Sequence, residues 1–594
     1  MEPVRYHVVA DPAAHRFRVR GVLRAPAANP VFRLPSWIRG SYRVRDFARH
    51  VMDLHARVEG APAAIERLDK RSFGLRARAG ERIELEYQVH ALDPSVRKAY
   101  LDTRRGFFNG SSLFYCPQGA EGAPFAVEIA RPAHLACARW QLATAMTPQA
   151  VDAEGFGVYR AADYEELIDH PVEMAEFRRV AFEVDGIPHA FVLSGRCAPD
   201  EARLAADAAR LCAAQRALFD HEPELERYLF LTQVTGNGYG GLEHRASSAL
   251  VAARDALPRP GETRLRKGYR DFLGLVSHEY FHLWNVKRIA PRAFLESDLG
   301  AEAYSRDLWA YEGVTSYYDD LMLLRAGLID APAYLDLLAI QATRLQRTPG
   351  RRVQTLAEAS FEAWIKFYQP DENTPNAAVS YYVKGALVAV CLDLHLRRHS
   401  NVSLDEVLRA LWRRYGREGT PAPEGALEAV AAEVSGLDLR PQFDAWLRST
   451  EELPLAELLT EFGVQAERRA ARGAEDEGGR VEPRNGAPVW LGLRLRSGEA
   501  TIAQVLEDSP AQRAGLAAGD ALVALDGLRV SAATWDQRLE TLAPGHEVEL
   551  HFFRGDELHR VRLVAEAPPQ DTWTFTLAKV DGERLARRRA WLGV

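Results

Sequence analysis

The chain has 594 residues, enough for three or four domains that each bury a hydrophobic core. Its composition, 47% hydrophobic and 26% charged residues, is that of an ordinary globular protein. A formal net charge of −7 argues against a nucleic-acid partner, because nucleic-acid binders carry strongly basic surfaces.

The N-terminal segment, MEPVRYHVVADPAAHRF, lacks the basic stretch and the apolar stretch of a signal peptide. No uninterrupted apolar run approaches the length of a membrane-spanning helix. The five cysteines are odd in number and scattered, and their spacing indicates neither a metal site nor a disulfide framework. These features predict a cytoplasmic protein with no membrane partner.

Residues 1–185 are expected to form a β-rich, sandwich-like domain. Side-chain types alternate at 17–23 and at 81–87, and in the second segment Ile83, Leu85 and Tyr87 would share one face of a strand. Prolines and glycines separate these segments, and little helical periodicity is present.

The pattern becomes mostly helical in the next predicted domain, residues 186–465. A helix is predicted at 201–219, and a strand at 227–234 runs into the glycine-rich turn 236–241. Helical patterns then dominate from about residue 262 to residue 447. The charged, glycine-containing stretch 466–487 is a predicted linker. It precedes a small domain of short strands at 488–570 and a tail at 571–594.

The strongest functional motif is His278-Glu279-Tyr280-Phe281-His282, an H-E-x-x-H sequence. Residues four apart lie on one face of a helix, so both imidazoles can reach one metal ion. Zinc fits this pattern, because imidazole and carboxylate are its usual ligands. Glu279 would lie beside the metal without binding it, where it can take a proton from water.

A catalytic zinc ion has three protein ligands and one open position. The third ligand is expected to be Glu312, in the sequence Tyr311-Glu312-Gly313. Its distance in sequence from His282 lets a second helix return beside the first. We therefore expect one zinc ion per chain, held by His278, His282 and Glu312.

Four segments of the sequence resemble the glycyl aminopeptidase family of zinc peptidases. They are residues 278–289 (HEYFHLWNVKRI), 309–320 (WAYEGVTSYYDD), 34–42 (LPSWIRGSY) and 106–110 (GFFNG). The resemblance implies a multidomain α+β fold. Its parts would be an N-terminal β-sandwich-like domain, a thermolysin-like and mostly helical catalytic domain, and a C-terminal PDZ domain.

The same resemblance gives two further motifs a role. Residues 240–244 (GGLEH) are similar to the G-x-M-E-N strand of related aminopeptidases, whose glutamate binds the substrate's free α-amine. Leu replaces Met and His replaces Asn here, so the resemblance implies substrate-binding roles for Gly240, Gly241 and Glu243 alone, with Glu243 on the amine. Residues 380–386 (SYYVKGA) resemble a segment in which a tyrosine hydroxyl stabilises the oxyanion. Alignment on Y-x-K-G selects Tyr382, and the doubled tyrosine leaves Tyr381 as the alternative.

Residues 490–493 (WLGL) resemble the carboxylate-binding loop of PDZ domains. Such a loop offers backbone N–H groups to the C-terminal carboxylate of a peptide, while a sheet edge pairs with the peptide strand. A C-terminal peptide is therefore a possible ligand. The alternative is a docked structural domain that binds no peptide.

These observations favour a zinc aminopeptidase that releases small N-terminal residues, glycine or alanine, from peptides with a free N-terminus. The preference for small residues follows from the resemblance alone. One alternative is a zinc endopeptidase, and another is a PDZ-mediated peptide-binding protein whose metal site is not catalytic. Glu279 weighs against the last alternative, because a structural zinc site needs no base and would fill its fourth position.

Overall fold

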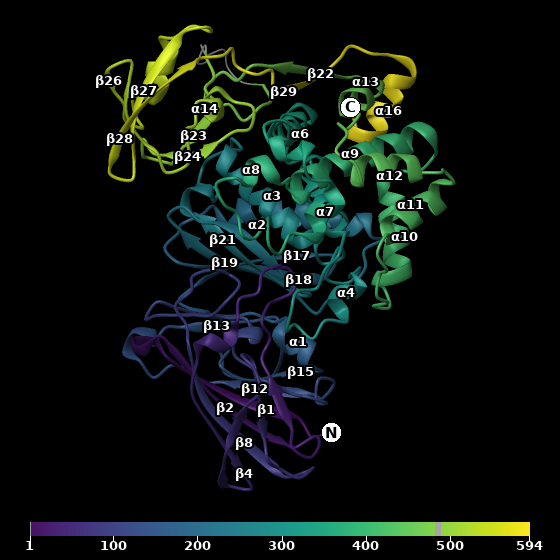
Figure 1. Ribbon diagram of the computed structural model, residues 1–594. Helices are drawn as coiled ribbons and strands as arrows, with labels where there is room; N and C mark the ends of the chain where they lie inside the picture. The colour runs from purple at the N-terminus through teal and green to yellow at the C-terminus, as the bar shows by residue number, and fades with distance from the viewer. Residues whose placement is uncertain (1, 474, 481–488) are drawn as a thin grey trace. The chain divides into compact units, whose positions relative to one another are not determined.

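The structure is a computed structural model that describes residues 2–473, 475–480 and 489–594 (Figure 1). It forms two compact units. The first comprises Met1–Ala303 and Trp412–Pro423, and the second comprises Tyr304–Leu411 and Glu424–Val594. The multidomain α+β fold expected from the sequence is confirmed, with an N-terminal β-rich domain, a helical middle region and a C-terminal PDZ domain.

The N-terminal domain of the first unit is built on an eight-stranded sheet with the order β14-β15-β12-β1-β2-β8-β4-β5. Ile83, Leu85 and Tyr87 of β8 (Arg82–His90) are buried on one face, as their alternation predicts. The other strands are β1 (Val4–Asp11), β2 (Arg16–Arg24), β4 (Val51–Val58), β5 (Ala61–Ala63), β12 (Phe125–Ile129), β14 (Thr147–Val151) and β15 (Gly157–Ala161).

Two four-stranded sheets complete this domain. One has the order β13-β16-β10-β9, with β13 (Gln141–Ala143), β16 (Val172–Ala175), β10 (Arg105–Phe108) and β9 (Tyr100–Leu101). The other has the order β11-β3-β7-β6, with β11 (Cys116–Pro117), β3 (Val31–Arg33), β7 (Ser72–Leu75) and β6 (Ile65–Arg67). A short helix, α1 (Tyr164–Ile168), follows β15.

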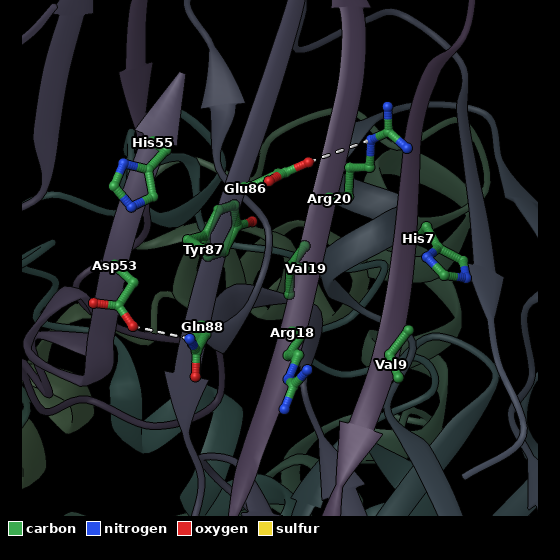
Figure 2. A pocket seen from close by; sticks show the side chains of 10 residues that line it. All are labelled: His7, Val9, Arg18, Val19, Arg20, Asp53, His55, Glu86, Tyr87 and Gln88. Carbon is green, nitrogen blue, oxygen red and sulfur yellow. Dashed lines mark hydrogen bonds and ion pairs between the residues drawn. The ribbon is translucent and has the colours of Figure 1, made fainter. Parts of the chain in front are cut away.

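A polar cavity of about 400 Å³ lies on strands β1, β2, β4 and β8 of the large sheet (Figure 2). Ion pairs and hydrogen bonds already join side chains within it, such as Arg20 to Glu86 and Gln88 to Asp53. None of the residues that the motifs single out lines this cavity. We therefore regard it as a solvated face of the sheet.

The second part of the first unit is a five-stranded sheet with the order β17-β18-β19-β21-β20. Strand β20 (Tyr239–Glu243) lies at its edge and runs antiparallel to β21 (Ser247–Ala253). The other strands are β17 (Arg178–Val184), β18 (Ile187–Ser194) and β19 (Tyr228–Thr235). Helices α2 (Glu201–Leu218) and α3 (Lys267–Phe281) pack together, and α3 contacts both β20 and β21. The short helix α4 (Arg292–Leu295) follows.

The second unit is mostly helical. A π-helical turn, η6 (Trp309–Gly313), continues into α5 (Val314–Arg325), and both pack against α9 (Tyr381–His399). The stretch Thr374–His399 is long and apolar enough to cross a membrane by length and composition, but 72% of its apolar window is buried, as in a core helix. The remaining helices are α6 (Ala331–Gln346), α7 (Leu356–Phe361), α8 (Thr374–Ala377), α10 (Leu404–Leu411), α11 (Ala426–Ser435), α12 (Arg440–Leu447) and α13 (Leu455–Glu461).

The PDZ domain is inserted between two strands that pair with each other, β22 (Val464–Arg469) and β29 (Thr572–Leu577). Its own elements are β23 (Leu493–Leu495), β24 (Ile502–Val505), α14 (Pro510–Arg513), β25 (Ala521–Leu525), β26 (Leu528–Arg529), α15 (Trp535–Glu540), β27 (Glu547–Arg554) and β28 (Glu557–Val564). The predicted linker 466–487 begins inside β22, and residues 481–488 lie outside the described ranges. The expected domain boundaries stay predictions.

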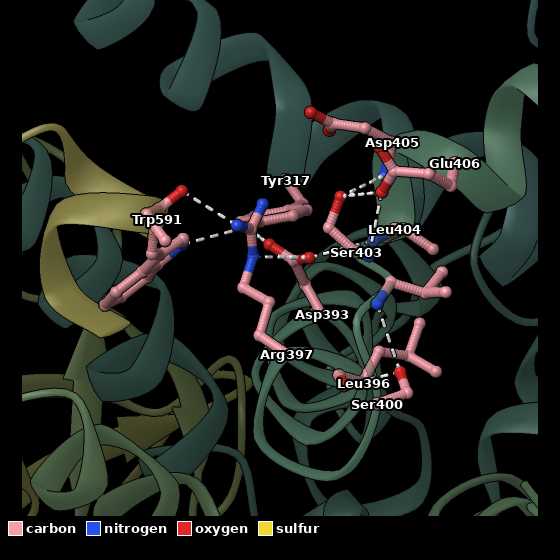
Figure 3. A network of polar contacts seen from close by, with 12 residues as sticks. Tyr317, Asp393, Leu396, Arg397, Ser400, Ser403, Leu404, Asp405, Glu406 and Trp591 are labelled. Carbon is pink, nitrogen blue, oxygen red and sulfur yellow. Dashed lines mark hydrogen bonds and ion pairs between the residues drawn. The ribbon is translucent and has the colours of Figure 1, made fainter. Parts of the chain in front are cut away.

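The predicted tail, residues 571–594, contains β29 and a helix, α16 (Gly582–Leu592), that packs on α5 and α9 (Figure 3). The indole of Trp591 donates to the Tyr317 hydroxyl at 3.0 Å, and Tyr317 donates to the Asp393 carboxylate at 2.6 Å. Asp393 also accepts from Arg397, at 2.9 Å. The last helix of the chain is thereby tied to both α5 and α9.

Candidate active site

Helix α3 presents the H-E-x-x-H motif near its C-terminal end, and His282 is its C-cap residue. Phe272, Leu275 and Val276 are buried, as their helical spacing predicts. The His278 and His282 rings lie with centroids 4.7 Å apart, because residues four apart share a face.

The orientation of the His282 ring is fixed by its own backbone neighbourhood. Its Nδ1 lies 2.8 Å from the carbonyl oxygen of Asn285, which can only accept, so Nδ1 carries the proton. Nε2 then keeps its lone pair, the state that a metal ligand requires. The two imidazoles of α3 and the hydrogen bond from Nδ1 of His282 to Asn285 fit a zinc site.

Two buried carboxylates lie close to His282, one on strand β20 and one on helix α3 itself. Ligand atoms of Glu243, Glu279 and His282 all lie within 4.8 Å of one another. Glu243 is 3% exposed and Glu279 is 5% exposed. The predicted amine-binding glutamate and the predicted base therefore belong to one cluster.

The glycines of the 240–244 segment explain how strand β20 approaches this cluster. A Cβ atom on Gly241 would lie 2.1 Å from Oε1 of Glu279, so only glycine leaves room for the carboxylate. Gly240 has φ +148°, which L side chains rarely adopt. Gly40 of the N-terminal domain has the same relation to Glu243, because its Cβ would lie 2.1 Å from Oε1.

The N-terminal domain also holds the strand itself. Arg97 donates from Nη2 to the carbonyl oxygen of Gly241 at 2.9 Å. Gly40 and Arg97 are thus residues of the site that the sequence motifs did not reveal. Gly40 does lie within the segment 34–42 (LPSWIRGSY), which carried the family resemblance.

Asp169 joins the segment that follows Glu243 to the segment that follows His282. It accepts from Nδ1 of His244 at 3.1 Å, from the Arg245 backbone N–H at 3.0 Å and from Nζ of Lys287 at 2.7 Å. Burial opposes ionisation of Asp169, but Lys287 and His244 outweigh it and hold the pKa of this carboxyl well below its usual value. His244, which stands where related aminopeptidases have asparagine, therefore has a structural partner here.

Glu312 lies on the π-helical turn η6 of the second unit and is 2% exposed. Single π turns inside helices are frequent at functional sites. The neighbouring Gly313 is needed for packing, because its Cβ would lie 2.5 Å from the Cα of Gly385 and 2.9 Å from the carbonyl oxygen of Tyr381. The glycines of the two motifs, Y-E-G and Y-x-K-G, therefore face each other.

Tyr381 and Tyr382 are the first two residues of α9, after the N-cap Ser380. Tyr381 is fully buried, whereas Tyr382 is only partly buried. Each hydroxyl lies within hydrogen-bonding distance of the Tyr368 hydroxyl. The greater exposure of Tyr382 favours it as the group that meets a substrate.

The loop at residues 490–493 of the PDZ domain is held by hydrogen bonds from neighbouring segments. The carbonyl oxygen of Gly492 accepts from the Leu506 N–H at 2.8 Å. Asn376 of α8 donates to the Val505 carbonyl and accepts from the Glu507 N–H, both at 2.9 Å. The segment behind the loop is therefore held by α8, which precedes Tyr381 and Tyr382 in sequence.

Family profiles match three parts of the chain. The profile described as M61 glycyl aminopeptidase matches residues 271–388, and that of the peptidase M61 N-terminal domain matches residues 5–176. A PDZ domain profile matches residues 478–564. A search of curated proteins gives no match.

Among solved structures, an aminopeptidase N family protein from Idiomarina loihiensis is similar over 99% of this chain and 100% of that chain, with 36% sequence identity and a TM-score of 0.94. An M1 zinc metallopeptidase from Deinococcus radiodurans covers 76% of this chain and 94% of its own length, with 14% identity and a TM-score of 0.48. The second likeness is too weak to support any inference. The first, together with the matched profiles and the H-E-x-x-H helix, shows that the chain is a peptidase of the M61 glycyl aminopeptidase family.

Proposed function

We propose that the enzyme is a zinc-dependent aminopeptidase that removes small N-terminal residues, glycine or alanine, from peptides. The observation that carries the proposal is the buried cluster of Glu243, Glu279 and His282, whose ligand atoms lie within 4.8 Å of one another. It sets a carboxylate suited to bind an ammonium group directly beside the carboxylate that serves as base. The description of the family as glycyl aminopeptidases supports the preference for small residues.

His278, His282 and Glu312 would hold one zinc ion per chain. Two imidazoles and one carboxylate are a usual ligand set for catalytic zinc. The hydrogen bond from Nδ1 of His282 to Asn285 supports this role, because it leaves Nε2 as the ligand atom. When bound, zinc supplies a Lewis acid that makes water acidic enough to lose a proton near neutral pH.

Residues of the chain would carry out the proton transfer, the stabilisation of the oxyanion and the binding of the substrate backbone. A carboxylate oxygen of Glu279 takes the proton from the attacking water and passes it to the leaving amine. The Tyr382 hydroxyl donates to the oxygen on which negative charge develops, with Tyr381 as the alternative donor. Gly240 and Gly241 let the edge strand approach the substrate backbone closely.

Electrostatics favour an aminopeptidase over an endopeptidase. Glu243 is buried, and a buried carboxylate is stabilised by a cation placed beside it. The ammonium of a free N-terminus is such a cation. Its hydrogen bond to Glu243 is charge-assisted and directional, so only the first peptide bond would reach Glu279.

The PDZ domain would bind the C-terminal segment of a peptide at residues 490–493, where backbone N–H groups can hold a carboxylate. All five cysteines are free thiols in the structure. A cytoplasmic location is part of the proposal, because free thiols suit a reducing compartment.

The decisive experiment compares Gly- and Ala-peptides with a free amine and their N-acetylated forms. We expect stepwise release of single residues from the free peptides and poor cleavage of the acetylated ones. Glu243→Ala should raise KM for free-amine substrates and narrow the difference, because the ammonium loses its partner. Glu183→Ala, which removes an exposed carboxylate of the same unit, is the control. Efficient internal cleavage of acetylated peptides by the unaltered enzyme would identify an endopeptidase.

A second experiment tests the metal chemistry. We expect about one zinc per purified chain, with activity lost on chelation. Glu279→Gln keeps the shape of the side chain, so zinc should stay bound while kcat falls at least ~10²-fold. Glu312→Ala should lose zinc, and full zinc content in that variant would exclude Glu312 as a ligand. Unchanged hydrolysis in Glu279→Gln would instead favour a non-catalytic metal site and a peptide-binding protein.

A further inference from the structure

Three tyrosine hydroxyls meet at the N-terminal end of α9. The Oη atom of Tyr368, in the segment between α7 and α8, lies 3.2 Å from Oη of Tyr381 and 3.1 Å from Oη of Tyr382. The ring of Phe367 packs on both, with centroids 5.0 Å from Tyr381 and 5.5 Å from Tyr382. The two residues that compete for the oxyanion role are therefore joined through a third hydroxyl.

The direction of these hydrogen bonds decides what the cluster can do. Tyr381 donates to Tyr368. A tyrosine hydroxyl has one proton, so Tyr368 accepts from Tyr381 with a lone pair and keeps its own proton to donate. Either partner can be the donor in the pair of Tyr368 and Tyr382. A continuous chain results when Tyr368 donates to Tyr382.

We propose that Tyr368 is a positioning residue, which donates to Tyr382 and so directs the Tyr382 O–H toward the oxyanion of the substrate. The inference rests on the proposed aminopeptidase reaction and deepens it. The chain of hydrogen bonds begins at Tyr381, which is fully buried, and ends at Tyr382, which is partly exposed. The last O–H group of the chain, which is left to donate, therefore belongs to the more accessible residue. Tyr381 is then the first link of the chain rather than a second oxyanion donor.

Two physical effects make this chain useful. A hydroxyl that accepts a hydrogen bond becomes a stronger donor, because hydrogen bonds in a chain polarise one another. The bond from Tyr368 also prevents the Tyr382 proton from turning toward Tyr368 itself. The donor is therefore oriented before the substrate arrives, which electrostatic stabilisation of a transition state requires.

The test is a double-mutant cycle with Tyr368→Phe and Tyr382→Phe, measured on an aminoacyl reporter with zinc-loaded, full-length enzyme. Tyr382→Phe should lower kcat ~10²–10³-fold. Tyr368→Phe should lower kcat about 2- to 12-fold with unchanged KM, the effect of one neutral hydrogen bond. In the Tyr382→Phe background, Tyr368→Phe should change nothing further, because its acceptor is gone. Tyr304→Phe, which removes an exposed hydroxyl of the same unit, should keep the original kcat.

The outcomes distinguish a failure of this hydrogen-bond chain from a failure of the proposed aminopeptidase function. Wild-type kcat in Tyr368→Phe, or equal losses from this substitution in both backgrounds, would overturn the hydrogen-bond chain and leave the role of Tyr382 standing. Wild-type kcat in Tyr382→Phe beside an inactive Tyr381→Phe would move the oxyanion role to Tyr381 and overturn the chain as well. A raised KM in Tyr368→Phe would indicate a contact with the substrate instead.

Discussion

Replacement of Asp169 by asparagine should destabilise the enzyme by about 3–5 kcal/mol, because it leaves a buried ammonium without its counter-ion. The side chains of Asp169 and Lys287 are 14% and 7% exposed, and their charged atoms lie 2.7 Å apart. The His244 ring and the Arg245 N–H share the same carboxylate. Asparagine keeps the shape but not the charge, so the loss reports the ion pair rather than packing.

The assay is urea unfolding followed by tryptophan fluorescence, as a function of pH. The pKa of Asp169 is lowered in the folded protein, so its contribution is present above the unfolded pKa of about 4 and is lost as pH falls below it. The difference between the two proteins should therefore narrow in acid. Asp255→Asn, which removes an exposed carboxylate of the same unit, is the control and should unfold like the original.

The Asp169 variant should also bind substrate less well. His244 and Arg245 directly follow Glu243, so release of this segment lets the carboxylate that we propose as the amine-binding group move. We expect a raised KM for free-amine peptides with a smaller change in kcat. Unchanged stability at neutral pH together with an unchanged KM would refute the assignment of Asp169 as the residue that joins these segments.

Three further predictions follow from the packing. Gly241→Ala places a Cβ 2.1 Å from the present position of a Glu279 oxygen and should displace that carboxylate. We expect kcat, measured at saturating substrate, to fall by about 10²-fold while the thermal midpoint of unfolding stays unchanged. Burial and the nearby glutamates raise the pKa of Asp307 to about 7, so the folded protein keeps a proton on Asp307 that the unfolded chain loses above about pH 4. The original protein therefore loses stability as pH rises from about 4 to 7, and Asp307→Asn does not. Measured as denaturation midpoints across that range, the variant should gain up to about 4 kcal/mol relative to the original. Replacement of residues 470–571 by a short linker should retain hydrolysis of small reporters, whereas truncation before β29 should lower the thermal midpoint, because it removes Trp591.

The end of the chain is part of the helical unit and is not a removable tail. The predicted linker 466–487 suggests that everything beyond the helical domain can be removed. Strand β29 pairs with β22, and helix α16 contacts α5 and α9, so a chain ending near Gly473 loses more than the PDZ domain. Excision of the insert leaves those contacts intact and tests the PDZ domain alone.

The sequence by itself determined the family, the fold class and the buried helix that carries His278, Glu279 and His282. These features are local, because helical spacing and strand alternation depend only on neighbours along the chain. The sequence also showed the glycines of the motifs, but it did not show why glycine is needed at those positions. Gly313 is needed because it meets Gly385, a residue distant in sequence.

Only the tertiary structure decided which residues surround these motifs. Gly40, Arg97 and Asp169 belong to the N-terminal domain. Nothing in their local sequence marks them as the residues that meet Glu243, Gly241 and Arg245, respectively. Tyr368 meets Tyr382 for the same kind of reason, through a loop that folds back on the start of α9. Contacts between segments distant in sequence depend on how whole elements pack, because a side chain's neighbours are fixed by the fold rather than by its place in the chain.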